Sequence, residues 1–167
     1  QNLIHQSQHT QTSMNMTLLG TYDYNTTQGN DIWGWVDANA NEYALVGLRN
    51  GLSVVDVTNP SSPVEMFFIN DINSTWRDIK TWGNYAYVTT ESDTGLLIVD
   101  LNDMTGNTSW HVSQFTNPTT GASISFTSAH NIYIDEKLIQ LLTSLSIPGS
   151  YWSSTEAGSQ KYHAYSV

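Results

Sequence analysis

Cysteine is absent from the 167 residues, which excludes disulfides, thiolate metal sites and haem attachment. Lysine and arginine together number 5, against 15 aspartates and glutamates, for a net charge of −10. Nucleic acid and anionic membrane surfaces bind to clustered basic residues, so neither is favoured as a partner. No apolar run approaches the roughly 20 residues of a membrane helix, so we expect no membrane insertion. No signal peptide is visible, and a start at Gln1 fits a processed mature form.

The composition favours a β protein of one domain. A chain of this length can bury one sizeable core. Charged residues make up only 12% of it, while Asn, Thr, Ser, Gly and aromatic residues are plentiful. That balance is typical of extracellular β proteins rather than of cytosolic helical ones. We therefore predict the all-β class and an extracellular or cell-surface location.

Four sequons support the same location. An Asn-x-Ser/Thr triplet accepts a glycan in a eukaryotic secretory route, provided that it lies on the surface. The asparagines predicted as glycosylation sites are Asn15, Asn25, Asn73 and Asn107.

The stretch from Asp31 to Ile69 predicts a four-stranded antiparallel sheet. Its first hairpin turn is Asp37-Ala-Asn-Ala-Asn, whose side chains can close their own backbone bonds. Asn50-Gly51 is the strongest short hairpin signal, and the prolines of Asn59-Pro-Ser-Ser-Pro end the third strand. The predicted strands are residues 31–36, 42–48, 52–57 and 64–69.

The same layout returns from Trp76 onward, and a third unit opens at His130. Asp31, Asp78 and Asn131 occupy equivalent positions at the starts of the three units. Four-stranded units at this period predict β-propeller blades, here an incomplete set of two to three; a β-sandwich with coincidental repeats is the alternative. The second set of predicted strands is residues 78–82, 85–90, 96–101 and 110–115.

The segments on either side of the repeats lack this pattern. We predict a flexible N-terminal tail over residues 1–16, a short strand over 18–24, blades over 17–136 and an atypical tail over 137–167. The histidines of the first tail, His5 and His9, are read as solvated rather than metal-binding.

Six strings, taken in order, carry a family resemblance. They are Asn30-Asp-Ile-Trp-Gly, Asn41-Glu-Tyr-Ala-Leu-Val-Gly, Val54-Val-Asp-Val-Thr-Asn-Pro, Trp76-Arg-Asp-Ile-Lys-Thr-Trp-Gly-Asn-Tyr-Ala-Tyr, Gly95-Leu-Leu-Ile-Val-Asp-Leu and Phe126-Thr-Ser-Ala-His-Asn-Ile-Tyr-Ile-Asp. Over about residues 17–136 the chain thus resembles the LVIVD-repeat proteins of the choice-of-anchor B group. The resemblance implies a β-propeller displayed outside the cell, with binding or adhesion suspected and no catalytic residues to transfer.

Two departures from that family pattern have consequences. Fewer than three complete units are present, and open terminal blades invite pairing with another chain, so self-association is expected. After Asp135 the pattern is replaced by a weakly helical apolar period. A frameshifted reading of residues 137–167 would account for the change, and the coding DNA would test it.

The starts of the units are the predicted ligand site. Innermost strands of successive blades begin near the propeller axis, so Asp31, Arg77, Asp78, His130 and Asn131 would line one mouth of the channel. Such a ring could hold an ion or an anionic or sugar ligand. In the alternative interpretation, Arg77 pairs with a neighbouring aspartate and the others cap strand ends.

Metal binding and cofactors have weaker support in the sequence. The strings Asp37-Ala-Asn-Ala-Asn and Asp71-Ile-Asn-Ser-Thr resemble the start of a calcium loop but lack its glycine at position six and its glutamate at twelve. This excludes an EF-hand and leaves a loosely bound calcium as the one cofactor considered.

The sequence contains no serine nucleophile elbow, phosphate loop or zinc-protease motif. We therefore predict a secreted or cell-surface repeat module with a binding, adhesion or assembly role, whose partner is a copy of itself or an extracellular polymer or protein. The alternative is an extracellular polymer hydrolase that uses carboxylates at the channel mouth.

Overall fold

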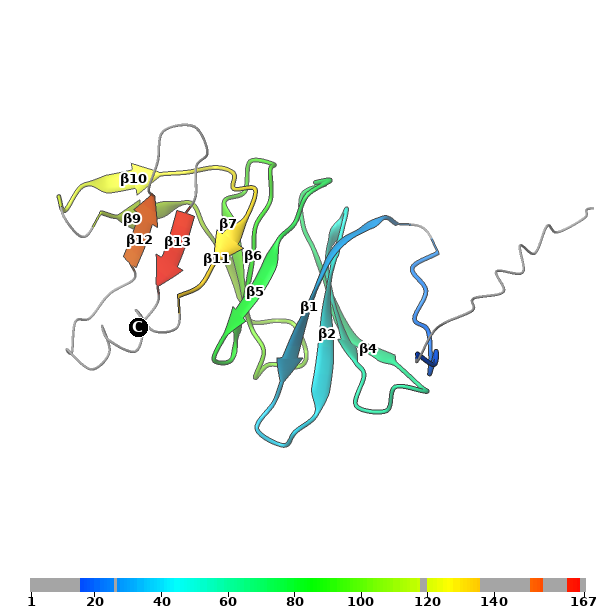
Figure 1. Ribbon diagram of the computed structural model, residues 1–167. Helices are drawn as coiled ribbons and strands as arrows, with labels where there is room; N and C mark the ends of the chain where they lie inside the picture. The colour runs from blue at the N-terminus through cyan, green and yellow to red at the C-terminus, as the bar shows by residue number, and fades with distance from the viewer. Residues whose placement is uncertain (1–15, 26, 118–119, 136–150, 155–161, 166–167) are drawn as a thin grey trace, which may run out of the picture.

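The computed structural model describes residues 16–25, 27–117, 120–135, 151–154 and 162–165. All regular structure in these ranges is β-strand, which confirms the all-β class. The sheets lie in a row (Figure 1), with the sheet of residues 29–70, blade 1, next to the N-terminal segment and the sheet of residues 79–112, blade 2, in the middle. No helix in the described ranges is long and apolar enough to cross a membrane.

Blade 1 is a four-stranded antiparallel sheet in the order β1-β2-β3-β4, as predicted. The Asp37 carboxylate closes its first hairpin by accepting hydrogen bonds from the backbone N–H of Asn39 and Asn41 at 2.8 and 2.9 Å. Gly51 follows the second turn with a φ of 155°. The strands are β1 (Gly29–Val36), β2 (Glu42–Leu48), β3 (Gly51–Asp56) and β4 (Val64–Asn70).

Blade 2 repeats this sheet in the order β5-β6-β7-β8. The first hairpin has the same register in both blades: Trp35 pairs with Tyr43 in blade 1, and Trp82 pairs with Tyr85 in blade 2. The strands are β5 (Ile79–Trp82), β6 (Tyr85–Val88), β7 (Leu96–Asp100) and β8 (Ser109–Val112). The prediction of two four-stranded, propeller-like blades is therefore confirmed.

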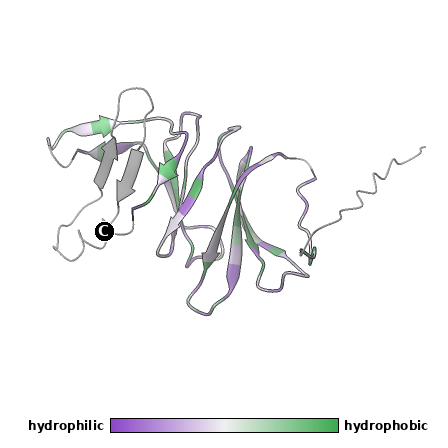
Figure 2. Cartoon of the chain, viewed as in Figure 1, coloured by the Kyte–Doolittle hydropathy of each residue, from purple (hydrophilic) through white to green (hydrophobic). Residues whose placement is uncertain are grey.

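The largest core cluster lies between the two blades. Blade 1 contributes one face of its sheet, including Leu45 and Val54, and blade 2 contributes the opposite face, including Ile79 and Leu97. All four side chains are at most 1% exposed, and burying each contributes roughly 1.5–3 kcal/mol. Figure 2 shows hydrophobic and hydrophilic residues along the same strands, as expected for sheets that bury one face against a neighbour. A second cluster, which includes Tyr87, packs on the other face of blade 2.

The turn between β7 and β8 is closed by Asp103. Its carboxylate accepts hydrogen bonds from the Thr105 hydroxyl at 2.5 Å, the Thr108 hydroxyl at 2.7 Å and the Thr105 N–H at 3.0 Å. The bonds from Thr105 and Thr108 lower the pKa of Asp103 to about 2. Because these bonds favour the ionised form, the turn is tightest when Asp103 is charged.

We expect the Asp103 carboxyl to titrate near pH 2 in a carbon-detected NMR titration. The folded pKa lies below the unfolded value of about 3.9, so the stability that Asp103 contributes is fully present above pH 4 and is lost as the pH falls toward 2. Thr105→Val should raise the midpoint toward the unfolded value. A wild-type midpoint close to 4 would contradict the hydrogen-bonded turn.

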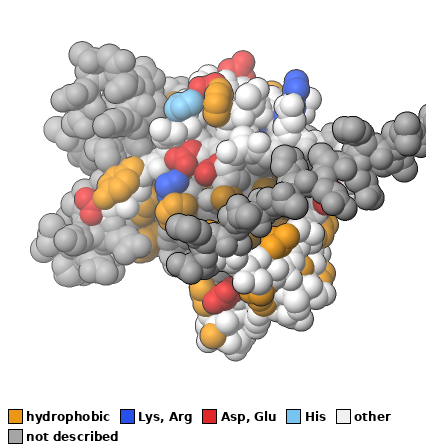
Figure 3. Space-filling view, turned by 45° about the vertical axis from the view of Figure 1, so that its right-hand side comes forward, with side chains coloured by type: hydrophobic (Ala, Val, Ile, Leu, Met, Phe, Trp, Pro, Cys, Tyr) orange, Lys and Arg blue, Asp and Glu red, His pale blue; other side chains and the backbone are white. Residues whose placement is uncertain are grey.

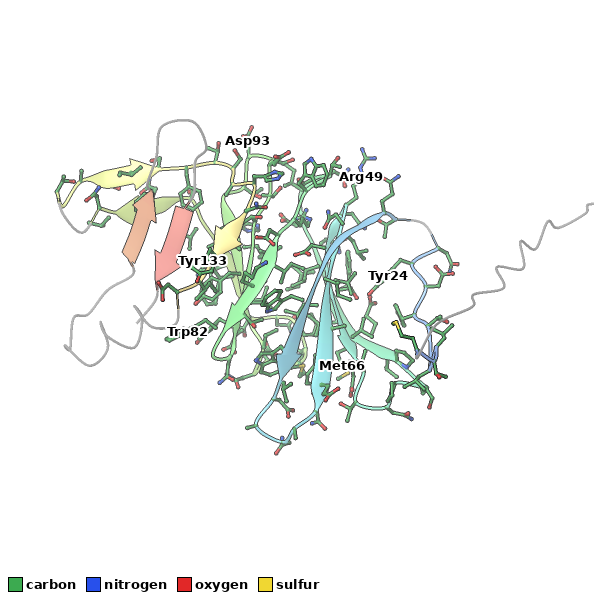
Figure 4. All side chains as sticks on the ribbon, viewed as in Figure 1. Tyr24, Arg49, Met66, Trp82, Asp93 and Tyr133 are labelled. Atoms are coloured by element: carbon green, nitrogen blue, oxygen red, sulfur yellow. The ribbon has the colours of Figure 1, made fainter. Side chains whose placement is uncertain are left out.

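Two strand predictions from the sequence, one for the N-terminal segment and one for the last strand of blade 2, are wrong. Residues 18–24 form no strand; instead the segment lies along blade 1, where the Tyr24 hydroxyl donates to Ser53 Oγ at 2.8 Å (Figure 4). Residues 110–115 are not one strand, because pairing ends at Val112 and Gln114 begins a separate hairpin with residues 123–125. The strands of this hairpin are β9 (Gln114–Thr116) and β10 (Ser123–Ser125).

The third unit differs from the antiparallel blade that its sequence predicted. β11 (Ile132–Tyr133) pairs in parallel with β13 (Tyr162–Tyr165), and β13 pairs with β12 (Tyr151–Ser154) in the order β11-β13-β12. A parallel partner comes from far along the chain, so the local pattern at Ile132 held no signal for it. Of the predicted tail over residues 1–16, residues 1–15 lie outside the described residues, and so does the weakly helical period over residues 136–147.

Candidate functional site

The aspartates at the starts of the units each bind the backbone of the next unit. Asp31 lies in β1, and its Oδ2 accepts the N–H of Ile79 at the start of β5, at 2.9 Å. Asp78 directly precedes β5, and its Oδ2 accepts the N–H of Ile132 at the start of β11, at 2.8 Å. One carboxylate at a fixed position thus caps the first strand of the following sheet. This matches the strand-capping role weighed for these residues in the sequence.

Asn131 continues the series at the start of the third unit. It precedes Ile132 as Asp78 precedes Ile79 and as Asp31 precedes Ile32, and it is exposed. Its side-chain oxygen is an acceptor of the same reach as a carboxylate oxygen, without the charge.

Arg77 is buried rather than directed toward a channel. Its side chain is 0% exposed, and Nη1 forms an ion pair with Asp71 Oδ2 at 2.6 Å. Nε donates to the carbonyl oxygen of Leu48 in blade 1 at 2.9 Å, and Nη2 donates to the carbonyl oxygen of Ile72. The guanidinium therefore joins blade 1 to the loop that leads into blade 2. Its pairing with Asp71 is the alternative that the sequence analysis gave for Arg77.

The partner of Arg77 is itself fully engaged. The Asp71 side chain is 3% exposed, and its Oδ1 accepts the Ile72 N–H at 2.8 Å and lies 3.1 Å from His111 Nε2. At the other string that resembles a calcium loop, desolvation acts to raise the pKa of Asp37, but hydrogen bonds from Asn41 and Asn39 outweigh it and lower that pKa. In the described ranges no group of three or more acidic or histidine residues could hold a metal ion, and the loosely bound calcium stays a prediction.

An exposed cluster lies beside the capped strand starts. His130 Nδ1 is 2.5 Å from Glu91 Oε1, and the His130 ring lies 5.7 Å from the ring of Trp76, which is 51% exposed. Ser74 fixes the loop beneath, since its hydroxyl donates to the Trp76 carbonyl at 2.8 Å and accepts the Glu91 N–H at 3.3 Å. We call Trp76, Glu91, His130 and Asn131 the mouth surface.

The mouth surface is only partly predictable from the sequence. His130 and Asn131 belong to the predicted site. Trp76, at the start of the second unit, and Glu91 were not part of that predicted site. Glu91 lies in the polar turn after β6, and no motif or spacing in the sequence connects that turn with the third unit.

A second polar group lies on the inner strands of the two blades. The Lys80 ammonium is 2.6 Å from Asp78 Oδ1 and 4.4 Å from the centroid of the Trp33 ring. The Trp33 indole N–H in turn donates to the Thr81 hydroxyl at 3.0 Å. These contacts connect β1 to β5 and leave Asp78 with both carboxylate oxygens engaged.

The predicted glycosylation sites that the structure describes lie at the surface. Asn25, Asn73 and Asn107 are exposed, as a glycan acceptor must be, while Asn15 lies outside the described residues. The Asn107 amide donates to the Thr105 hydroxyl at 2.8 Å, so a glycan there would stand on an ordered side chain. Glycosylation itself stays a prediction.

Comparison with known families agrees with the repeat seen in the structure. Residues 40–71 and 75–109 each match the family model of the LVIVD repeat. The first match covers β2 to β4, and the second covers β5 to β7. No curated protein and no solved structure matches the chain.

Proposed function

Taking the two LVIVD repeats as the premise, we propose that this chain is a secreted or cell-surface module of the choice-of-anchor B type that binds rather than catalyses. The blades are the scaffold, and the mouth surface is the recognition site. The ligand class that we propose is an extracellular polymer or protein without strong negative charge, because the chain itself carries a net charge of −10.

The observation that carries the proposal is the exposure of Trp76 between polar groups. The Trp76 indole is half exposed, and the His130 imidazole and the Glu91 carboxylate lie beside it. Such a ring offers a ligand an apolar platform with hydrogen-bonding groups at its edge. Other polar groups near the strand starts, Asp31, Arg77 and Asp78, are engaged within the scaffold. They support the surface without being free to meet a ligand.

Trp76→Ala should weaken binding to immobilised neutral polysaccharide, with cellulose and chitin as probes, by roughly tenfold or more. Removing the indole deletes the apolar platform but no contact of the core. The matched control is Trp110→Ala, since Trp110 is similarly exposed at 43% but lies on β8, away from the mouth surface. Equal binding by wild type and Trp76→Ala, with the control also unchanged, would count against the mouth surface as the site.

One contact favours the hydrolase alternative. The 2.5 Å approach of His130 to Glu91 is the kind of pair that can move a proton. If the chain is a hydrolase, turnover of these same polymers should be measurable in wild type and lost in both Glu91→Gln and His130→Ala with the circular dichroism spectrum retained. Binding without turnover supports the binding module.

A further inference from the structure

Glu91 has one carboxylate oxygen that bonds to no described residue. Its Oε1 lies 2.5 Å from His130 Nδ1, and within the described ranges no hydrogen bond or ion pair reaches its Oε2. The side chains of Glu91 and His130 are 45% and 57% exposed. In Figure 3 a histidine lies next to acidic and hydrophobic side chains at the top of the face in view. An ionised carboxylate oxygen at the surface can accept a hydrogen bond from a ligand.

The turn that carries Glu91 is fixed to the loop that carries Trp76. The Glu91 N–H donates to the Ser74 hydroxyl at 3.3 Å, and the Ser92 hydroxyl donates to the Asn73 carbonyl at 2.8 Å. The backbones that carry the carboxylate and the indole are therefore held together before a ligand arrives, which lowers the entropy cost of binding.

The chain already holds one ammonium group with an indole and a carboxylate. The Lys80 ammonium lies 4.4 Å from the centroid of the Trp33 ring and 2.6 Å from Asp78 Oδ1. An indole face attracts a cation through its quadrupole, and the carboxylate adds a charge-assisted hydrogen bond. Trp76 and Glu91 present the same two groups. No lysine or arginine in the described ranges forms an ion pair with Glu91 or lies over the Trp76 ring.

The spacing of these two groups fits a sugar that carries an amino group. The Trp76 indole and the Glu91 carboxylate both contact the His130 ring, so about one side-chain ring separates them. A sugar ring stacked on the indole can therefore bring its own amino group to the carboxylate. A lysine side chain of a protein also ends in an ammonium, but it loses more rotamer freedom on binding than a sugar ring does. The net charge of −10 adds a long-range attraction for a cationic polymer.

We infer that Glu91 makes the mouth surface selective for polysaccharides whose sugars carry a cationic amino group. The Trp76 indole stacks on a sugar ring, and Glu91 Oε2 accepts a hydrogen bond from the ammonium. The selectivity rests on the proposed function, because it names the polymer that the same site takes. It adds a role for Glu91, which binding of a neutral polysaccharide does not require.

Isothermal titration calorimetry with two soluble oligosaccharides tests this selectivity. The probes are cellohexaose and its derivative with primary amines in place of the C6 hydroxyls, compared at about pH 7.5, where such amines are charged. Wild type should bind the amino form at least about tenfold more tightly. Glu91→Gln should bind both forms with the same affinity, within about twofold, and should keep the wild-type affinity for cellohexaose. Trp76→Ala should lose affinity for both.

The matched control is Asp93→Asn. Asp93 is exposed and lies two residues after Glu91 in the same turn, so its replacement removes the same charge from the same region. Asp93→Asn should keep the preference for the amino form. A loss of preference as large as that in Glu91→Gln would show general attraction to an acidic chain and would overturn the role of Glu91.

The other outcomes separate the selectivity from the proposed function. Equal affinity of wild type for both hexamers, with both lost in Trp76→Ala, would overturn the selectivity alone. Cellohexaose binding that is the same in Trp76→Ala and wild type would count against the proposed function, and no binding of either hexamer would overturn both. Hexalysine is the probe for a protein ligand. If it binds as tightly as the amino hexamer and depends equally on Trp76 and Glu91, the polysaccharide is the wrong class.

Discussion

Replacing Arg77 by methionine is expected to lower the free energy of unfolding by about 3–5 kcal/mol. The substitution keeps most of the apolar stem but removes the charge from a site that is 0% exposed. Asp71, 3% exposed, would then be a buried carboxylate without its ion-pair partner, and the Leu48 and Ile72 carbonyls would lose their donor. Urea unfolding followed by circular dichroism measures the change.

The control for this experiment is Arg49→Met. Arg49 directly follows β2 of blade 1, and unlike Arg77 it is exposed. Figure 4 shows its side chain at the edge of the sheet. Its replacement should stay within about 0.5 kcal/mol of wild type. The double variant Arg77→Met with Asp71→Leu should recover part of the loss, because no unpaired charge remains buried. A loss below about 1 kcal/mol for Arg77→Met would show that the ion pair does not hold the two blades.

Asp31→Ala should lower the free energy of unfolding by about 1–3 kcal/mol, the typical effect of leaving a buried N–H without an acceptor. The Ile79 side chain is 0% exposed, so water has little access to the N–H that Asp31 caps. Asp31→Asn keeps a side-chain oxygen and should lose much less.

The matched control is Asp93→Ala, at an exposed aspartate in the loop before β7, shown at the edge of the molecule in Figure 4. It should leave the free energy of unfolding within about 0.5 kcal/mol of wild type. If Asp31→Ala has as small an effect as this control, the hydrogen bond from the Ile79 N–H of blade 2 to the Asp31 carboxylate of blade 1 contributes little to the free energy of unfolding.

The strands of the two blades could be predicted because their signals are local. Alternating apolar residues, the Asp37 turn and the Asn50-Gly51 turn each act over a few residues, and the structure places β1 to β7 within a few residues of the predicted bounds. The equivalence of Asp31 and Asp78 was also visible, since it requires only the alignment of the two copies. The structure adds what that equivalence is for: each carboxylate reaches the next sheet, 48 and 54 residues further along the chain.

The parts that could not be predicted depend on contacts between units. Arg77 looked like a channel residue because it begins a unit, but its direction is set by how blade 2 stacks on blade 1, which places Leu48 and Asp71 around it. The parallel pairing of β11 with β13 joins residues about 30 apart and has no turn signal. Glu91 is close to His130 only because the two units are adjacent, and no spacing in the sequence indicates that contact.

Amide hydrogen exchange at Ile79 tests most directly whether the carboxylate at the start of a blade couples that blade to the next unit. Ile79 and Val88 pair within blade 2, so the ratio of their exchange rates separates a local effect from a general loss of stability. We expect the Ile79 amide to be protected in wild type and in Asp31→Asn, and to exchange at least about tenfold faster relative to Val88 in Asp31→Ala. An unchanged ratio in Asp31→Ala would contradict coupling of the two blades through the Asp31 carboxylate.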